Sequence, residues 1–499
     1  MTAPNILFVL PFVGLLGSIA LLPVFAPELW ERRHERIALL WALASIVPGI
    51  AAFSLGFVAD SVLHTLLFEY LPFIVMAFVL YVIAGEVRVS GQLSGTPLGN
   101  SILLFVGTVL ASFMGTTGAS MLLVRPLLRA NASRRQRVHQ VVFLIFLVSN
   151  AGGALTPLGD PPLFLGFLKG VSFDWTLKHL WSPTLILSGV LLICFFFIDR
   201  YHWIREGSPV GGSSGSKLRI QGGVHAALLL VCAGVVLASG LLRDHELFTD
   251  SEAAALHQPR LVEAESQLRE AEAQASVAGG CEDILRARAR LNELRAIQEA
   301  SAQRGVSLGT VHLSWLQLLR DGLLVLCAFI SLALVPPRVR RSDGFTWAPV
   351  REVAVLFAAI FITMAPVIQM LQAGVDGPFD QLILGVVRAD GSPIPFRYYF
   401  ATGALSAFLD NAPTYFVFFN MAGGGAQALM NEVSALAAIS AGAVFFGAMT
   451  YVGNAPNFMV RSIAAREGVA MPSFFGYIGR WSLPILLPLL LLLGCCFFA

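Results

Sequence analysis

The chain has 499 residues, of which 56% are hydrophobic and 13% are charged, and its formal net charge is +2. A soluble globular domain is nearer half apolar and a quarter charged, so this composition excludes an ordinary soluble protein. The basic residues form short clusters beside apolar windows, a pattern that gives no indication of nucleic-acid binding. Uncharged apolar windows of about 20 residues, enough to cross roughly 30 Å of hydrocarbon, recur from end to end. Because a lipid-exposed backbone must satisfy its own hydrogen bonds, we expect these spans to be helices.

The first apolar window, residues 5–27, has no basic N-terminal region and is too long for a cleaved signal, so we interpret it as a transmembrane helix. Residues 1–36 then comprise this helix and a cytoplasmic loop. Further spans are predicted over residues 37–58, 62–85, 139–168, 181–199, 223–241, 313–335, 351–371, 434–460 and 480–498. The predicted fold class is an all-α polytopic membrane protein with about 10 transmembrane helices.

Two other apolar windows, residues 99–130 and 396–425, are interrupted midway by small polar residues. A polar turn at membrane depth is tolerated only where it is buried in protein or lines a wet cavity, so we predict two re-entrant helical hairpins. The positive-inside rule supports them, because the basic clusters share one side only if each hairpin returns to the side it entered. These clusters are Arg32, Arg33 and Arg36; Arg125, Arg129, Arg134, Arg135 and Arg137; Arg200, Arg205, Lys217 and Arg219; Arg338, Arg340 and Arg341; and Arg461, Arg466 and Arg480. We therefore expect an inner (plasma) membrane protein with both termini outside.

One long polar segment, residues 242–312, separates the spans and follows a cytoplasmic loop and linking helix at 200–241. Leu261, Ala264 and Leu268 follow heptad spacing, and so do Ile284 and Leu291 after them. The spacing predicts a helical hairpin outside the bilayer. It is either a spacer or a docking or homodimer contact.

An internal repeat is the main evidence for function. An offset of 294 residues aligns residues 153–164 with 447–458, with six identities in twelve positions. An offset of 295 aligns residues 111–118 with 406–413. We assign repeat 1 to residues 37–199 and repeat 2 to 313–499. Five crossings separate the copies, so the second is inverted. Inverted repeats with broken helices are typical of secondary transporters, which bind their substrate near the bilayer midplane.

Proline and glycine interrupt the spans at 139–168 and 434–460, because proline removes an amide donor and glycine permits non-helical dihedral angles. Opened helices free carbonyl and hydroxyl groups that can bind a cation. The candidate site residues lie at these breaks and at the hairpin tips: Ser149, Asn150, Thr156, Gly159, Asp160, Thr450, Gly453 and Asn454 at the breaks, and Thr116, Thr117, Asp410, Asn411 and Thr414 at the tips.

Asp160 and Asp410 are the strongest candidates, because each is the one charged residue within its apolar stretch. A carboxylate at the bilayer centre costs about 3 kcal/mol even on lenient insertion scales, so each should be protonated, ion-paired or bound to a cation such as Na⁺. For Asn150, Asn411 and Asn454, capping of a broken helix end is the alternative. A purely structural role is also open for Thr117 and Thr414.

The stretch from Ser149 to Asp160, SNAGGALTPLGD, resembles the broken-helix motif of NhaD-type sodium/proton antiporters in the ion transporter superfamily, which also holds citrate transporters. The stretch from Asp410 to Thr414, DNAPT, resembles the second hairpin tip of that superfamily. The resemblance covers nearly all of the membrane part. It implies two hairpin tips and two unwound helices around a sodium and substrate site, in a core that moves by an elevator mechanism. Pro161 and Pro162 depart from the threonines that often follow the motif aspartate in antiporters.

Two transport functions follow. The first is sodium/proton antiport, in which an intramembrane aspartate exchanges a proton for sodium. The alternative is sodium- or proton-coupled uptake of citrate or another di- or tricarboxylate. A membrane scaffold would gain nothing from two buried carboxylates. No nucleophile–base pair or metal cluster is visible in the sequence, and the six cysteines lack zinc-site spacing, so we expect neither an enzyme nor a cofactor.

Overall fold

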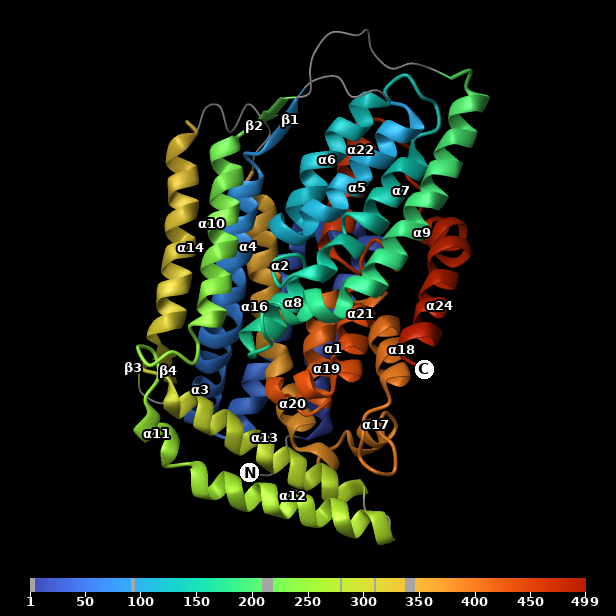
Figure 1. The fold of residues 1–499 in the computed structure, drawn as a ribbon. Coiled ribbons are helices and arrows are strands. Elements are labelled where there is room, and N and C mark those ends of the chain that lie inside the picture. The colour runs from blue at the N-terminus through green and yellow to red at the C-terminus, as the bar shows by residue number, and fades with distance from the viewer. Residues whose placement is uncertain (1–4, 91–94, 209–218, 279–280, 309–310, 337–345) are drawn as a thin grey trace.

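The computed structural model describes residues 5–90, 95–208, 219–278, 281–308, 311–336 and 346–499. Lys217, Arg338, Arg340 and Arg341 of the predicted basic clusters lie outside these residues. The described chain is a bundle of long helices with two short antiparallel strand pairs (Figure 1). The pairs are β1 (Arg88–Ser90) with β2 (Arg219–Gln221) and β3 (Gly305–Leu308) with β4 (Val311–Ser314).

One group of helices, which we call the scaffold, packs along one side of the bundle. Within it α2 packs on α1 and α16, and α14 packs on α4 and α10. The scaffold helices are α1 (Leu10–Phe25, preceded by the 3-10 turn η1, Ile6–Val9), α2 (Pro27–Ala52), α3 (Leu55–Thr65), η2 (Leu66–Tyr70), α4 (Leu71–Ala84), α10 (Gly223–Leu241), α14 (Trp315–Leu334) and α16 (Ala348–Gln372).

The remaining membrane helices form what we call the core, which contains both predicted hairpins and both broken helices. The hairpins are α5 (Pro97–Met114) with α6 (Thr116–Ala130), and α18 (Pro395–Ser406) with α19 (Asn411–Met421). The first broken helix is α7 (Val138–Leu147), η3 (Ala151–Leu155) and α8 (Pro161–Leu168), and the second is α21 (Val433–Phe446), η5 (Gly447–Met449) and α22 (Ala455–Arg466). The long helix α9 (Trp175–Arg205) and the final run of α23 (Phe474–Tyr477), η6 (Ile478–Leu486) and α24 (Leu487–Phe497) flank them.

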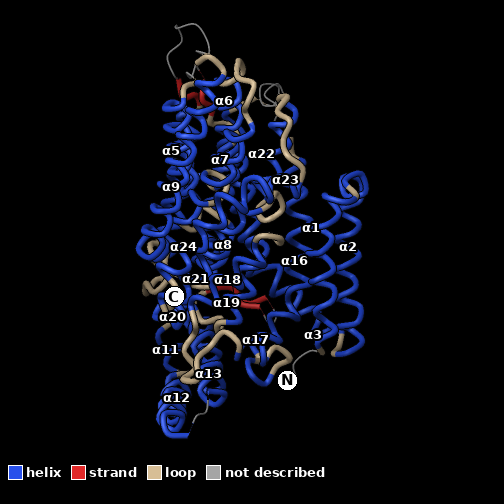
Figure 2. Tube along the Cα trace, turned by 90° about the vertical axis from the view of Figure 1, so that its right-hand side faces the viewer, coloured by secondary structure: helices blue, strands red, loops and turns tan. Residues whose placement is uncertain are grey.

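The core has the inverted arrangement that the repeat predicts. The first hairpin and α22 occupy one end of the bundle, and the second hairpin and α8 occupy the other (Figure 1). Helix α22 packs on α6, and its counterpart α8 packs on α19. Figure 2 shows that α5 and α6 extend farther toward their end than α1 and α2 do. The predicted all-α polytopic fold with two inverted repeats is confirmed.

Ten described helices are long and apolar enough to cross a membrane, and nine of these correspond to predicted spans. The tenth is α5, one arm of the first hairpin. The predicted span at 434–460 is absent from the ten because the break shortens its apolar part to residues 433–449. The cytoplasmic loop predicted before residue 37 is helical, because Pro27 begins α2 at a position where proline is favoured. The charges at 28–36 therefore project from a helix end.

A buried polar cluster fastens the first hairpin to α7 and α9. The carboxylate of Asp199 lies 2.7 Å from Arg134 Nη1 and 2.6 Å from His139 Nε2. It also accepts hydrogen bonds from Asn100 Nδ2 at 2.9 Å and Gln140 Nε2 at 3.2 Å. All five residues are buried. Arg134, which the sequence places among the cytoplasmic arginines, is therefore a buried ion-pair partner.

The polar segment between α10 and α14 lies across the end of the bundle opposite the first hairpin (Figure 1). It contains α11 (Ser251–Ala255), α12 (Gln258–Ala278) and α13 (Cys281–Ala302), and Leu261, Ala264 and Leu291 pack between α12 and α13. Helix α13 also contacts the core: Arg288 donates to Gly391 O at 2.9 Å and Asn292 to Gly423 O at 3.3 Å. Short helices also connect the membrane helices near this contact: η4 (Gly374–Asp376) and α17 (Asp380–Leu384) lie between α16 and α18, and α20 (Ala426–Asn431) lies between α19 and α21.

The Asp199 cluster gives a first prediction. Asp199→Asn should lower the free energy of unfolding by about 3–5 kcal/mol, because it leaves the buried Arg134 guanidinium without a counter-charge. The matched control is Asp174→Asn, which removes the solvent-exposed ion pair to Lys178 and should change stability by less than about 1 kcal/mol. Thermal midpoints of the detergent-purified variants measure the difference. Equal midpoints would contradict a stabilising role for the buried pair.

Candidate functional site

The two helix breaks have the same local construction. In the first, Gly159 crosses Gly153 so closely that a Cβ on Gly159 would lie 2.2 Å from Gly153 O. In the second, a Cβ on Gly453 would lie 2.6 Å from Gly447 O. No side chain fits at either crossing, because real Cβ atoms do not approach oxygen this closely. The helix then resumes at Pro161 or Ala455, where proline at the first or second position fits because those amides need no partner.

The break threonines anchor the chain to the hairpins. Thr156 Oγ1 donates to Ser112 O on α5, and Thr450 Oγ1 donates to Ala407 O at 2.6 Å just after α18. Each hydroxyl also accepts a hydrogen bond from the backbone amide two residues later in the chain, Leu158 N at 3.2 Å and Val452 N at 3.1 Å. The hydroxyls of both predicted threonines are therefore hydrogen-bonded to backbone groups. Among the described residues, neither hydroxyl is hydrogen-bonded to a carboxylate.

The hairpin tips reach the breaks through backbone as well as side-chain contacts. Gly115 turns the first tip with φ +79°, and Thr116 N donates to Gly159 O at 2.8 Å. At the second tip, Asp410 caps α19 by accepting a hydrogen bond from Ala412 N at 3.1 Å. Thr414 Oγ1 donates to Asp410 O at 3.0 Å, so this predicted residue stabilises the first turn of α19.

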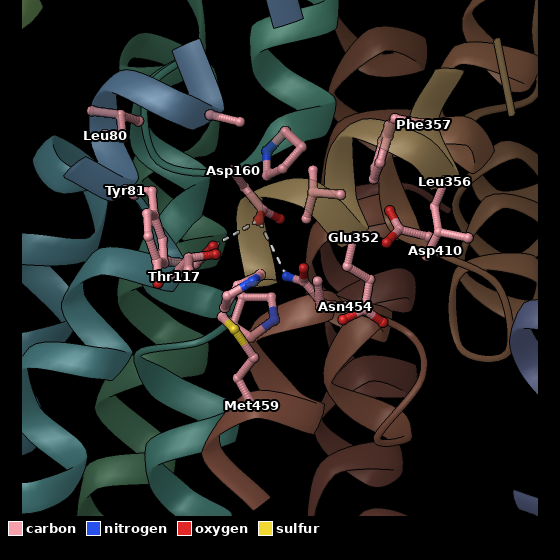
Figure 3. Close-up of a pocket in the computed structure, with 18 of the residues that line it drawn as sticks. Leu80, Tyr81, Thr117, Asp160, Glu352, Leu356, Phe357, Asp410, Asn454 and Met459 are labelled. Atoms are coloured by element: carbon pink, nitrogen blue, oxygen red, sulfur yellow. Dashed lines mark hydrogen bonds between the residues drawn. The ribbon is translucent and has the colours of Figure 1, made fainter. Parts of the chain in front are cut away.

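Asp160 lies where both tips and both breaks meet (Figure 3). Its side chain is 1% exposed. Asp160 Oδ1 accepts from Thr116 Oγ1 at 3.0 Å and from Asn454 Nδ2 at 3.2 Å, and Asp160 Oδ2 accepts from Asn411 Nδ2 at 2.6 Å. The structure thus brings together Asp160 with Thr116, Asn411 and Asn454. All three donors are neutral, so nothing in this shell neutralises the charge of an ionised Asp160.

Behind Asn454 lies a second layer of buried amides. Asn454 Nδ2 also contacts Ser149 O at 3.0 Å and Asn150 Oδ1 at 3.3 Å, and Asn150 Nδ2 donates to Asn457 Oδ1 at 2.8 Å. The hydroxyl of Ser149 pairs instead with Ser120 Oγ at 2.7 Å. Asn457 is not among the residues that the sequence predicts for the site. Its signal was available, since the 294-residue offset places it opposite Leu163 and makes it a polar exception within the repeat.

A cavity of about 250 Å³ separates Asp160 from the scaffold. Asp160, Asp410, Thr117 and Gly159 line it from the core, whereas α1, α2, α4 and α16 supply the scaffold wall. Asp160 and Asp410 face this one space and interact electrostatically. The scaffold adds a third carboxylate, Glu352 of α16 (Figure 3). Sequence reasoning missed Glu352 because it stands at the end of its apolar window, where an interfacial charge is ordinary.

The donor set around Asp160 suits a hard cation. The described lining residues of the cavity include three carboxylates and no Lys, Arg or His. Asn411 Oδ1 is buried and has no hydrogen-bond partner among the described residues, although its amide nitrogen is bound to Asp160. An unpaired buried acceptor is costly. A cation beside Asp160 could use both this oxygen and the carboxylate.

The comparisons with known proteins agree with a transport architecture. No curated protein matches the chain. A family model described as "Putative citrate transport" matches residues 2–268 and again residues 260–498, so the two matches together cover nearly the whole chain and follow its duplication. This chain therefore belongs to the family of membrane transport proteins described as "Putative citrate transport".

Proposed function

We propose that this protein is a secondary active transporter that exchanges sodium for protons at Asp160. In one state the Asp160 carboxylate binds sodium together with neutral oxygens. In the other it is protonated, and sodium has left. Because the charge of Asp160 is compensated in both states, the loaded core can cross the membrane in either form, whereas an ionised and empty core cannot.

The observation that carries this proposal is the neutral surrounding of a buried carboxylate. Thr116, Asn411 and Asn454 orient the charge of Asp160 without cancelling it. An uncompensated buried charge costs several kcal/mol, so the site favours a cation or a proton. Sodium is a hard cation that takes oxygen ligands, and Asp160, Asn411 and the cavity-lining carboxylate of Asp410 supply them.

The movement that we infer is an elevator-type displacement of the core against the scaffold. Both hairpins and both breaks belong to the core, so Asp160 would move with its ligands intact. The arginine-rich ends of α6 and α22 lie at one end of the bundle, and α12 and α13 lie at the other end (Figure 1). By the positive-inside rule we assign that end to the cytoplasm, and the termini and residues 242–312 to the outside of the inner membrane.

A second candidate is cation-coupled citrate uptake, which the family description favours. Four helices, α6, α8, α19 and α22, begin around Asp160, and helix N-termini attract anions. However, Asp160 and Asp410 already stand at the starts of α8 and α19. Citrate would therefore need an accompanying cation to offset its repulsion by the three cavity carboxylates. In this function sodium at Asp160 is the coupling ion.

A proteoliposome experiment separates the two functions. With an internal pH dye and an outward sodium gradient, antiport predicts internal acidification without citrate, because protons enter as sodium leaves. Asp160→Asn removes the group that exchanges a proton, and Asp410→Asn removes a carboxylate ligand of sodium. Each should abolish the signal while leaving a folded protein, because asparagine keeps the side-chain volume. The control is Asp390→Asn, in an exposed loop, which should exchange normally.

Each alternative outcome has a distinct meaning. Entry of labelled citrate under an inward sodium gradient, with no response to sodium alone, would replace antiport by the citrate function. Exchange at the wild-type rate in Asp160→Asn would contradict the assigned site under either function.

A further prediction concerns Thr116. Thr116→Val keeps the side-chain shape but removes the hydroxyl that orients Asp160, so sodium binding should weaken by about 1 kcal/mol, or roughly fivefold. The control is Thr363→Val on α16, whose buried hydroxyl bonds, among the described residues, to carbonyls of its own helix. The measurement is the increase in thermal midpoint produced by sodium chloride relative to choline chloride. An undiminished increase in Thr116→Val would show that this hydroxyl plays no part in sodium binding.

A further inference from the structure

Glu352 is an exposed side chain of α16 that projects into the same cavity as Asp160 and Asp410 (Figure 3). It belongs to the scaffold, whereas both aspartates belong to the core. Glu352 makes no ion pair or hydrogen bond with any described residue, and the titratable group that acts on it electrostatically is His34 of α2. The neighbouring Arg351 is already paired with Glu35 at 2.8 Å. The carboxylate of Glu352 is therefore available to a cation.

The cavity lies toward one end of the bundle. Its scaffold wall includes Pro349, Val350 and Glu352 in the first turns of α16, Trp30 in the first turn of α2 and Tyr81 in the last turn of α4. Helix α4 leads into β1, and β1 lies at the same end as the first hairpin (Figure 1). Glu352 thus lies between Asp160 and the arginine-rich end.

Toward the other end, the scaffold and core are in contact. Lys169 Nζ, just after α8, lies 2.8 Å from Glu69 Oε1 on the scaffold and 4.8 Å from the ring centre of Phe416. Phe416 also meets Phe361 of α16 edge-on at 6.3 Å. None of these four residues lines the cavity. In this conformation the approach to Asp160 from the end that carries α12 and α13 is therefore packed with side chains.

We propose that Glu352 is the scaffold carboxylate that receives the cation from the arginine-rich end and passes it to Asp160 and Asp410. This inference rests on the proposed function and deepens it by naming a residue that increases cation affinity at one face of the membrane. A carboxylate in a low-dielectric cleft raises the local concentration of cations. Because Glu352 stays with the scaffold, it faces the aspartates only when the cavity adjoins this end. Its contribution is therefore confined to one face of the membrane.

The test measures the apparent KM for sodium in membrane vesicles of both orientations. The face that carries residues 242–312 is identified by labelling Leu256→Cys with an impermeant maleimide, because Leu256 is highly exposed, and unaltered protein serves as the blank. Glu352→Gln should raise the apparent KM about tenfold for sodium presented at the arginine-rich face, with the maximal rate retained. At the opposite face the KM should stay unchanged. Glu352→Asp, which keeps the charge, should resemble the wild type and also serves if Glu352→Gln fails to fold.

The matched control is Glu31→Gln near the start of α2, which removes the same charge from the same end of the protein but does not line the cavity. An equal rise in KM in Glu31→Gln would reduce the effect to general surface charge and overturn the proposal. A wild-type KM in Glu352→Gln, a rise at both faces, or a raised KM in Glu352→Asp at full expression would also overturn it. These outcomes are distinct from failure of the proposed function, which would show as no sodium-dependent flux in the unaltered protein.

Discussion

The burial of one carboxylate at the meeting point of the two repeats is the constraint on which the rest of the structure depends. Asp160 is enclosed by donors from three separate elements: Thr116 from α6, Asn411 from α19 and Asn454 at the start of α22. Each of these elements must end or begin inside the helix bundle for its donor to reach Asp160. The two hairpin tips and the two helix breaks are therefore parts of one arrangement, and the glycine crossings and threonine anchors fix its backbone.

The inverted symmetry explains why the shell contains one carboxylate rather than two. The repeat aligns Asp160 with Asn454, and both residues stand immediately before the resumed helix, α8 or α22. Their side chains meet directly at 3.2 Å. Two carboxylates at that distance could not both ionise. Asparagine in the second copy turns this repulsion into a hydrogen bond and leaves Asp160 as the one shell residue that can exchange a proton for a cation.

The fold could be predicted in large part because hydrophobic length and proline or glycine placement act locally. The hairpin at 99–130 and the break at Thr156–Asp160 follow from such rules. Helix ends were less predictable. Helix α2 begins at Pro27 rather than near residue 37, because a charged segment next to an apolar span can form either a loop or a continuation of the helix. The Asp199 cluster escaped prediction because its partners come from α5, α7 and the connection between α6 and α7. No local pattern pairs Arg134 with a residue 65 positions away.

The candidate site residues differ in how far local sequence determines them. Position within a break or at a hairpin tip drew attention to Asp160, Asn411 and Asn454, whose side chains meet in the structure. It could not distinguish them from Thr156 and Thr450, whose hydroxyls bind backbone, because the direction of a side chain in an irregular segment depends on tertiary contacts. Glu352 lies outside the breaks altogether. Its relation to Asp160 arises from the packing of scaffold on core, which is the interface that an elevator movement would change. Glu352 is a carboxylate that the scaffold contributes at one end of the cavity. Under the proposed function, the two directions of transport therefore need not have the same affinity for the cation.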